Sequence, residues 1–149
     1  MKTLILILGM WITFSPAYCP EMPEELKFNF VTTYFVDKMY DAIFEATAYV
    51  ESRNNPNAVN RIEQAYGIVQ IRQIRLDDYF QRTGTRYYLT QMQDPIKAKE
   101  VFMYYAKQYP PEKLEQICRE WNGGPKGMKY VGTKKYYEKV NNQIKKLQV

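Results

Sequence analysis

Residues that start and stop helices divide this chain into short segments, and they constrain its fold more than any other feature. Pro56 ends one helical stretch and Gly84 another, because proline cannot continue a helix and glycine readily adopts the left-handed terminating conformation. Asp94-Pro95 and Pro110-Pro111 open helices, since proline is favoured in the first helical turn, and Asn122-Gly123-Gly124-Pro125 stops the second of these. The helices expected from these signals are Asp37 to about Arg53, Gln73 to about Arg82, Asp94 to about Gln108, Glu112 to about Trp121, and Thr133 to about Leu147, with Asp37 and Thr133 as caps.

The pattern predicts a mostly α single domain with at most a very short β element. Residues 57–71 show no helical periodicity, so we expect irregular chain there with at most a short extended turn. Residues 21–36 are expected to form a lead-in segment. The 149 residues suffice for one domain with a real core, and they contain no internal repeat, low-complexity segment or linker.

The first residues predict a secretory signal peptide. Lys2 gives a positive start, Leu4 to Phe14 is apolar, and Ser15-Pro16-Ala17 supplies small residues at the positions that a cleavage site needs. The apolar run is too short to span a bilayer comfortably. Cys19 does not have the small residues beside it that lipidation requires. We therefore expect a signal over residues 1–17 and an exported soluble domain over 18–149, located in the periplasm or cell wall.

Composition excludes several kinds of chemistry. The chain has no histidine, which rules out Ser/His and Cys/His nucleophiles and leaves almost no soft metal site, so we expect no metal and no cofactor. The net charge of +5 suits an anionic polymer such as the bacterial wall, or an acidic membrane surface. No nucleic-acid-binding signature accompanies that charge, and we expect no nucleic-acid partner. Cys118 lies on an apolar helical stripe and is expected to be a buried free thiol, although a Cys19–Cys118 disulfide remains open.

Glu51 stands at the end of a largely apolar helix, where a negative charge is unfavourable. Residues at helical spacing before it, Ala48, Thr47, Phe44 and Ile43, form a weakly polar to apolar stripe. Apolar surroundings and the negative end of the helix dipole should both raise the pKa of its carboxyl group. The position therefore suits an acid that holds its proton near neutral pH. The alternative is an exposed glutamate on a frayed helix end, paired with Arg53 or Arg61.

Four stretches of the chain, in order, resemble the lytic transglycosylases of the soluble, lysozyme-like class. "ESRNNPNAVN" resembles their E-S-x-x-N-P-x-A element, and "AYGIVQI" resembles G-L-M-Q-I, with Ile68 and Val69 in place of Leu and Met. "EWNGGP" stands where the family has A-Y-N-A-G-P, with Glu120 replacing alanine and Trp121 replacing tyrosine. "TKKYYEKV" is similar to the terminal T-x-x-Y-V-x-x-V.

The resemblance implies a lysozyme-like fold around a peptidoglycan cleft, and it implies roles for single residues. Glu51 matches the single catalytic acid/base of the family. The remaining matches are implied substrate-binding residues: Ser52 beside the acid, Gly67 and Gln70 on one cleft wall, Trp121 and Asn122 in the WNGG stretch, and Tyr136 leaning toward the glutamate.

The implied reaction is cleavage between N-acetylmuramic acid and N-acetylglucosamine with formation of a 1,6-anhydro end. Peptidoglycan glycan strands are then the partner, the protein is expected to be a monomer, and a secretion or conjugation machine is a further partner that the resemblance leaves open. One alternative is a goose-type hydrolytic lysozyme, whose water-holding carboxylate would come from Glu63, Asp77, Asp78 or Glu120. The other is a catalytically weak wall-binding or assembly protein.

Overall fold

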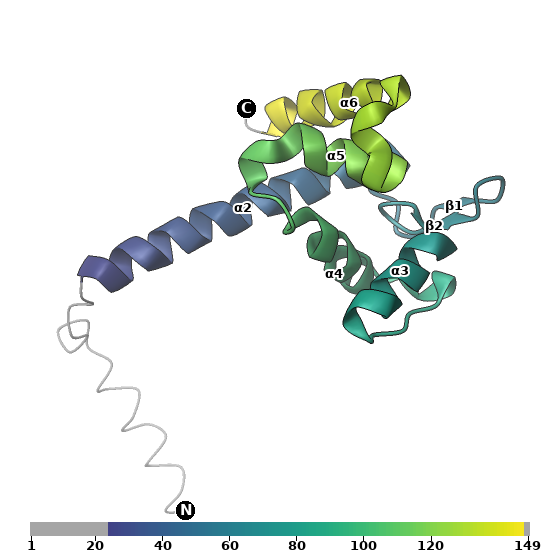
Figure 1. The fold of residues 1–149 in the computed structure, drawn as a ribbon, viewed down its shortest axis with the longest axis horizontal. Helices are drawn as coiled ribbons and strands as arrows, with labels where there is room; N and C mark the ends of the chain where they lie inside the picture. Colours follow the sequence, from purple (N-terminus) through teal and green to yellow (C-terminus); the bar gives the residue numbers. More distant parts are fainter. Residues whose placement is uncertain (1–23, 148–149) are drawn as a thin grey trace, which may run out of the picture. The chain divides into compact units, whose positions relative to one another are not determined.

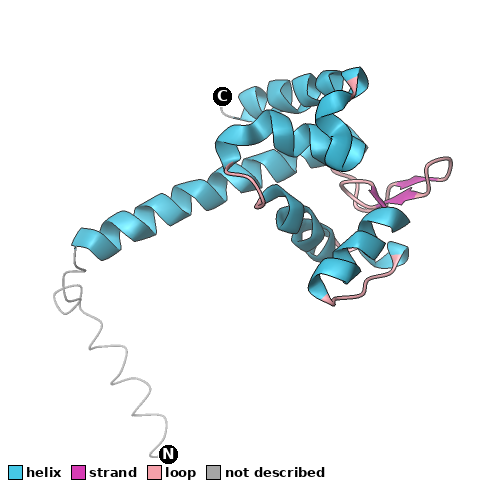
Figure 2. Cartoon of the chain, viewed as in Figure 1, coloured by secondary structure: helices cyan, strands magenta, loops and turns pink. Residues whose placement is uncertain are grey.

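The computed structural model describes residues 24–147, with side chains from residue 32 onward. This part of the chain is mostly helical and has one small antiparallel sheet, so the prediction of a mostly α fold with at most a very short β element is confirmed (Figures 1 and 2). The predicted signal segment, residues 1–17, and Cys19 lie outside the described residues. The α-helices are α2 (Glu24–Ser52), α3 (Gln73–Thr83), α4 (Pro95–Ala106), α5 (Leu114–Gly123) and α6 (Val131–Leu147); the strands are β1 (Val59–Asn60), β2 (Ala65–Tyr66) and β3 (Ile71–Arg72); the 3₁₀ helices are η2 (Leu89–Gln93), η3 (Pro111–Lys113) and η4 (Gly124–Lys129).

The chain divides into two compact units, residues 1–34 and 35–149, and the hydrophobic core belongs to the second. Side chains from α2, α3, α4, α5, α6, η2 and the sheet region meet in this core. Cys118 is fully buried there as a free thiol, and burial raises its pKa to about 12. The largest fully buried side chains of the core are Phe102, Ile71, Leu76, Met92, Val69, Val101, Val140, Thr47 and Cys118.

Helix α2 begins well before the expected start at Asp37, so that prediction is wrong. The stretch from Glu24 to Val36 contains neither glycine nor proline, and helix runs through it without interruption. Asp37 is not a cap, because its carboxylate accepts a 2.9 Å hydrogen bond from the Lys107 ammonium group just after α4. At the other end, Arg53 and Asn54 both have positive φ (58° and 61°) and terminate the helix.

A small three-stranded sheet occupies the region that was expected to be irregular. Strand β2 pairs antiparallel with both β1 and β3, in the order β1-β2-β3. The turn between β1 and β2 is held by Asn60, whose side-chain oxygen accepts hydrogen bonds from the backbone N–H groups of Ile62 (3.1 Å) and Glu63 (3.2 Å). Each strand has two residues, too few to show the alternating pattern that identifies strands in a sequence.

Most of the other helix boundaries follow the expected signals. Gly84 ends α3 in the left-handed conformation, and its N–H donates to the Phe80 carbonyl at 2.8 Å. Asp94 caps α4, accepting from the N–H of Ile96 at 2.9 Å, with Pro95 in the first turn. The predicted cap at Thr133 is wrong, because α6 begins at Val131 and Thr133 is buried inside its first turn.

Helix α5 packs against α6 and η4, and these elements lie side by side in Figure 1. None of the helices in the described part of the chain is long and apolar enough to cross a membrane.

Candidate active site

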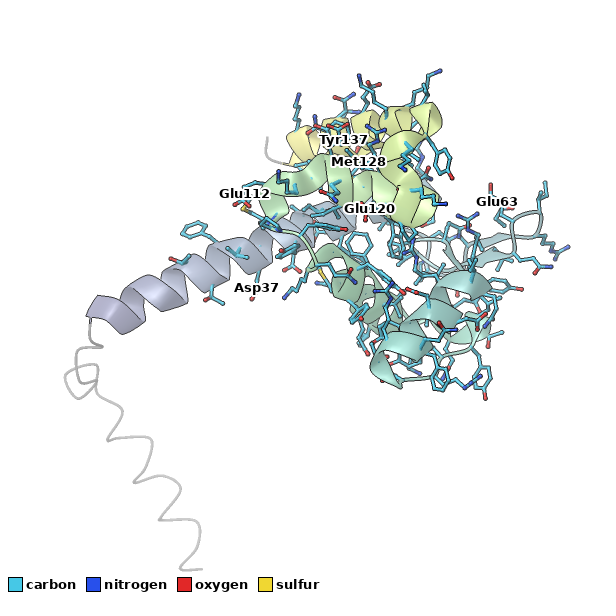
Figure 3. The ribbon with its side chains drawn as sticks, in the orientation of Figure 1. Asp37, Glu63, Glu112, Glu120, Met128 and Tyr137 are labelled. Atoms are coloured by element: carbon cyan, nitrogen blue, oxygen red, sulfur yellow. The ribbon has the colours of Figure 1, made fainter. Side chains whose placement is uncertain are left out.

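A cleft of about 860 Å³ lies in the second unit, and Glu51 is on its wall. The end of α2, the β1–β2 turn, β3, α3, α4 and α5 contribute the lining. Figure 3 labels two of its acidic residues, Glu63 at the hairpin and Glu120 on α5. A second hollow of about 550 Å³ shares Glu51 and Gln70 with the cleft, so both open onto the same carboxylate. The volume of the cleft lies within the range of small-ligand sites.

The structure places Glu51 in the last turn of α2, partly buried, as its apolar stripe predicts. The residues before it on this stripe, Ile43, Phe44, Thr47 and Ala48, are all buried. Its only hydrogen bond within the described residues comes from the hydroxyl group of Tyr136, which donates to Oε1 at 2.7 Å. No ion pair with Arg53 or Arg61 forms in the described part of the chain, so the frayed, exposed alternative is wrong.

The pKa of the Glu51 carboxyl group is raised to about 7, and burial is the largest cause of this rise. The hydrogen bond from Tyr136 acts in the opposite direction, because it stabilises the carboxylate. The negative charge of Glu63 raises the pKa further, whereas the positive charges of Arg72 and Lys139 lower it. The net result is a carboxyl group that is about half protonated at neutral pH, as a general acid/base requires.

Tyr136 supports Glu51 from α6 and does not line the cleft. Its side chain is buried, and burial together with the neighbouring Glu51 raises its pKa well above the ordinary value. The ring therefore keeps its proton and remains a hydrogen-bond donor to Glu51 throughout the physiological pH range. Because Oε1 of Glu51 accepts this bond, Oε2 is the oxygen that is left to exchange a proton with a ligand.

Ser52, Gly67 and Gln70 hold the loop between β2 and β3 in place. The Ser52 hydroxyl donates to the Ile68 carbonyl at 2.8 Å and accepts from the Asn55 N–H at 3.1 Å, which ties the end of α2 to this loop. Gly67 is buried with φ of 80°, and a Cβ atom there would lie 1.8 Å from the Met92 carbonyl oxygen. Neither Ser52 nor Gly67 lines the cleft.

Gln70 does line the cleft, in a left-handed conformation with φ of 52° that is uncommon for a non-glycine residue. Its amide nitrogen donates to the carbonyl oxygens of Gly67 (2.8 Å) and Ala58 (3.3 Å). The amide oxygen has no partner among the described residues and is available to a ligand. The unusual backbone conformation is therefore held by the side chain that faces the cleft.

Trp121 and Asn122 line the cleft from the C-terminal part of α5. The Trp121 ring packs edge-on against Phe102, with 4.8 Å between ring centroids, so it belongs both to the core and to the cleft wall. The Asn122 side chain makes no hydrogen bond with any described residue. Asn122 also has no positive φ, so the helix stop belongs to Gly124, whose φ is 71°.

Arg75 is the residue that sequence analysis missed. Its guanidinium group lies over the rings of both Tyr105 and Trp121, at 4.4 and 4.7 Å from their centroids. It also donates to the carbonyl oxygens of Trp121 (2.8 Å) and Glu120 (3.3 Å), and thereby fixes the end of α5. These partners lie 30 to 46 residues away in the chain, and no local pattern around Arg75 marks them.

Two other carboxylates of the cleft are engaged by neighbouring side chains. Oδ2 of Asp78 accepts from the Tyr105 hydroxyl at 2.7 Å and from Arg82 at 2.9 Å. Burial acts to raise the pKa of Asp78, but these hydrogen bonds and charges lower it overall. Both oxygens of Glu120 accept hydrogen bonds, from Tyr109 at 2.8 Å and Gln116 at 3.0 Å. Asp77 does not line the cleft.

The seven residues singled out in the sequence thus fall into two groups. Glu51, Gln70, Trp121 and Asn122 line one cleft, whereas Ser52, Gly67 and Tyr136 position the side chains or the backbone of that cleft. Ile68 and Val69 do not line it, and Val69 is fully buried in the core. Within the described residues no group of three or more His, Cys, Asp or Glu side chains could hold a metal ion.

No protein-family model matches this chain, and neither does any curated protein or solved structure. The function is therefore inferred from the sequence motifs and from the geometry of the cleft.

Proposed function

We propose that this protein is an exported peptidoglycan lytic transglycosylase that uses Glu51 as its single acid/base. One observation carries the proposal: Glu51 lines a cleft, has a pKa that burial raises to about 7, and keeps one carboxyl oxygen without a partner among the described residues. A group that must first give a proton and then take one back works best when its pKa lies near the working pH. The four sequence motifs support the same assignment.

In the proposed reaction, protonated Glu51 donates its proton to the glycosidic oxygen between N-acetylmuramic acid and N-acetylglucosamine. The acetamido oxygen of the muramic acid stabilises the positive charge that develops at C1 as the bond to the leaving oxygen breaks. The Glu51 carboxylate then takes the proton of the C6 hydroxyl group while that oxygen bonds to C1. The products are a free 4-hydroxyl and a 1,6-anhydro end, and no water is consumed.

The neighbours of Glu51 fit this cycle. Tyr136 stays protonated and donates to Oε1 in both states of the glutamate, so the carboxyl group keeps its orientation while Oε2 exchanges the proton. The free amide oxygen of Gln70 and the free side chain of Asn122 face the cleft and can bind sugar hydroxyl and acetamido groups. Positioning of this kind holds the C6 hydroxyl near C1.

The proposed substrate is the glycan strand of peptidoglycan, and the proposed location is the periplasm or the cell wall. The predicted signal segment supports export. Local opening of the wall for a secretion or conjugation machine is a role that such an activity would serve.

The test is mass spectrometry of the products from purified peptidoglycan digested in ¹⁸O-labelled water. Transglycosylation predicts products with 1,6-anhydro ends and no label. Glu51→Gln protein, checked for folding, is the matched control and should release almost no product. A binding-only protein would release none even as wild type, and would nevertheless sediment with the peptidoglycan.

A hydrolytic lysozyme is the second candidate, and one observation favours it. Glu63 is exposed at the β1–β2 turn and lines the same cleft, where its carboxylate could hold a water molecule. Hydrolysis predicts ordinary reducing ends that carry the ¹⁸O label, and it predicts that Glu63→Gln abolishes cleavage. Transglycosylation predicts instead that Glu63→Gln retains most of the activity.

A further inference from the structure

The positive charge of this chain is concentrated in its C-terminal part. Residues 124–147 contain seven lysines and one glutamate, a net charge of +6, so the rest of the chain contributes −1 to the total of +5. No acidic residue occurs from Trp121 to Tyr137. The lysines of α6 are all exposed, whereas Thr133, Tyr136 and Val140 of the same helix are buried. This distribution leaves a basic surface over η4 and α6.

The lysines of this surface form no ion pair with a described acidic residue, unlike three lysines elsewhere in the described structure. Lys97, Lys99 and Lys107 each form an ion pair with an aspartate, at 3.9, 2.7 and 2.9 Å. None of the seven lysines in residues 124–147 forms an ion pair with a described residue. Lys135 and Lys139 are four residues apart on one helix face, where like charges destabilise a helix. The arrangement therefore favours an external anionic partner over intramolecular pairing.

One end of the basic surface also exposes apolar side chains. Met128, Tyr130 and Val131 are all exposed at the junction of η4 and α6, and Val131 is 81% accessible. The exposed lysines on both sides of them in the sequence are Lys126, Lys129, Lys134 and Lys135. We call residues 126–135 the basic-apolar tip. Figure 3 shows Met128 on this side of the molecule, next to the start of α6.

The backbone under the tip is firmly held, so the exposure of its side chains is not a result of a loose loop. The buried Arg119 donates to the carbonyl oxygens of Met128 (2.7 Å) and Tyr130 (3.3 Å). The Thr133 hydroxyl lies 2.7 Å from the Gly127 carbonyl oxygen, within hydrogen-bond reach. Gly127 packs so closely that a Cβ atom there would lie 2.0 Å from the Arg119 carbonyl oxygen.

We propose that the basic-apolar tip docks on an anionic lipid bilayer. Lysines bind the phosphate groups of lipid headgroups, and each lysine near an anionic membrane contributes about fivefold in affinity. Apolar side chains presented beside them enter the boundary between headgroups and acyl chains. An anionic wall polymer would be bound by the lysines alone and would leave Met128, Tyr130 and Val131 in water. The combination therefore favours a bilayer surface.

Docking would bring the cleft close to the membrane. Gly124 and Pro125 line the cleft, and Lys126, the first residue of the tip, follows directly. A ligand in the cleft would then be bound near the bilayer surface. The inference does not depend on the reaction in the cleft, because membrane binding can be measured without any glycan.

The test is sedimentation with phosphatidylcholine vesicles and with mixed phosphatidylcholine–phosphatidylglycerol vesicles at physiological ionic strength. All variants carry the same N-terminus, and the quantity compared is the gain in affinity that phosphatidylglycerol brings. The wild type should show a clear gain. Replacing Lys126, Lys129, Lys134 and Lys135 with glutamine should weaken binding to mixed vesicles by at least about a hundredfold. The matched control replaces Lys97, Lys99, Lys107 and Lys113 with glutamine, which changes the net charge equally and should retain most of the gain.

The apolar part of the tip is tested with Val131→Ser, which should weaken binding to mixed vesicles by about tenfold. Its matched control is Ile96→Ser, at a site that is 79% accessible on α4 and outside the tip, and this variant should bind like the wild type. Equal loss in the two lysine variants would overturn the proposal. Wild-type binding by Val131→Ser, with loss only in the lysine variant, would show a general polyanion site and would equally contradict membrane docking.

Discussion

At the scale of single residues, the account depends on a carboxyl group that is buried at the unfavourable end of a helix. The pKa of Glu51 rises from an ordinary 4.5 to about 7, mainly because its surroundings penalise the charged form. In the unfolded chain the same group ionises at its ordinary pKa. The folded protein therefore binds more protons than the unfolded one between these two values, and its stability falls as the pH rises through them.

This linkage predicts a pH-dependent effect of Glu51→Gln on the free energy of unfolding. Well below pH 4.5 the glutamate is protonated in both states, so the pKa difference adds nothing there. Above about pH 7 the wild type holds an unfavourable buried charge that the variant lacks. Urea unfolding at both ends of this range should show that the variant gains roughly 3 kcal/mol relative to wild type as the pH rises.

Glu45→Gln is the matched control for this measurement, because Glu45 lies on the same helix with its side chain exposed. Its stability relative to wild type should depend little on pH. A Glu51→Gln difference that is the same at low and high pH would mean that the carboxylate is well solvated in the folded protein.

Asn122 allows a second prediction at this scale, since its side chain makes no hydrogen bond with a described residue and it lines the cleft. Asn122→Ala should keep the free energy of unfolding within about 1 kcal/mol, because alanine is the better helix former. Cleavage of peptidoglycan should fall by roughly ten- to a hundredfold, as expected when a hydrogen bond to substrate is lost. Asn142→Ala, on the exposed side of α6, should cleave normally; equal activities of the two variants would exclude Asn122 from substrate binding.

At the scale of elements, the loop between β2 and β3 contributes Gln70 to one wall of the cleft, and Gly67 permits the path of this loop. The backbone there has a positive φ and touches the η2 segment. Gly67→Ala should therefore destabilise the protein by at least about 3 kcal/mol, since it combines a disfavoured conformation with a steric clash.

Gly84→Ala separates the cost of the left-handed backbone conformation from the cost of the steric clash. Gly84 has a φ of 75°, close to the 80° of Gly67, but no atom lies within 4 Å of its Cβ position. This variant should lose only about 1–2 kcal/mol, the cost of the left-handed conformation alone. Chemical denaturation of both variants is the measurement. Equal losses would mean that the contact with Met92 is not tight.

The sequence predicts those elements whose boundaries depend on neighbouring residues. Gly84 and Asp94-Pro95 act within one helical turn, and both boundaries are confirmed. The start of α2 was predicted wrongly because aspartate often caps helices, whereas Asp37 lies inside α2 and no glycine or proline interrupts the helix before it. The Asp37 carboxylate binds Lys107, a residue 70 positions away. The two-residue strands were not predictable either, since alternation needs a longer run.

In the candidate site, too, features that depend on neighbouring residues could be predicted, and features that depend on distant residues could not. The burial of Glu51 followed from its own helical stripe, Ile43 to Ala48. Its hydrogen bond to Tyr136, 85 residues later, was indicated only by a family resemblance, because no local pattern connects the two residues. Arg75 was missed for that reason as well.

At the scale of the whole molecule, the reaction proposed for the cleft and the proposed membrane docking use different residues. The cleft brings together a carboxyl group with a raised pKa and free amide groups, whereas the basic surface lies on η4 and α6 and makes no ion pairs among the described residues. Charge-removing variants of the basic-apolar tip should therefore cleave soluble glycan fragments at the wild-type rate. Loss of that activity would show that the two regions are coupled.

The most direct test of the central claim is the cleavage rate of Glu51→Gln on purified peptidoglycan, measured beside the wild type and after folding has been verified by circular dichroism. Glutamine is nearly isosteric and keeps an oxygen that can accept from Tyr136, but it cannot donate or accept the proton of the reaction. The account predicts a loss of at least about a hundredfold, with the fold intact. Turnover close to that of the wild type in the folded variant would contradict it, because the acid/base would then have to be another residue.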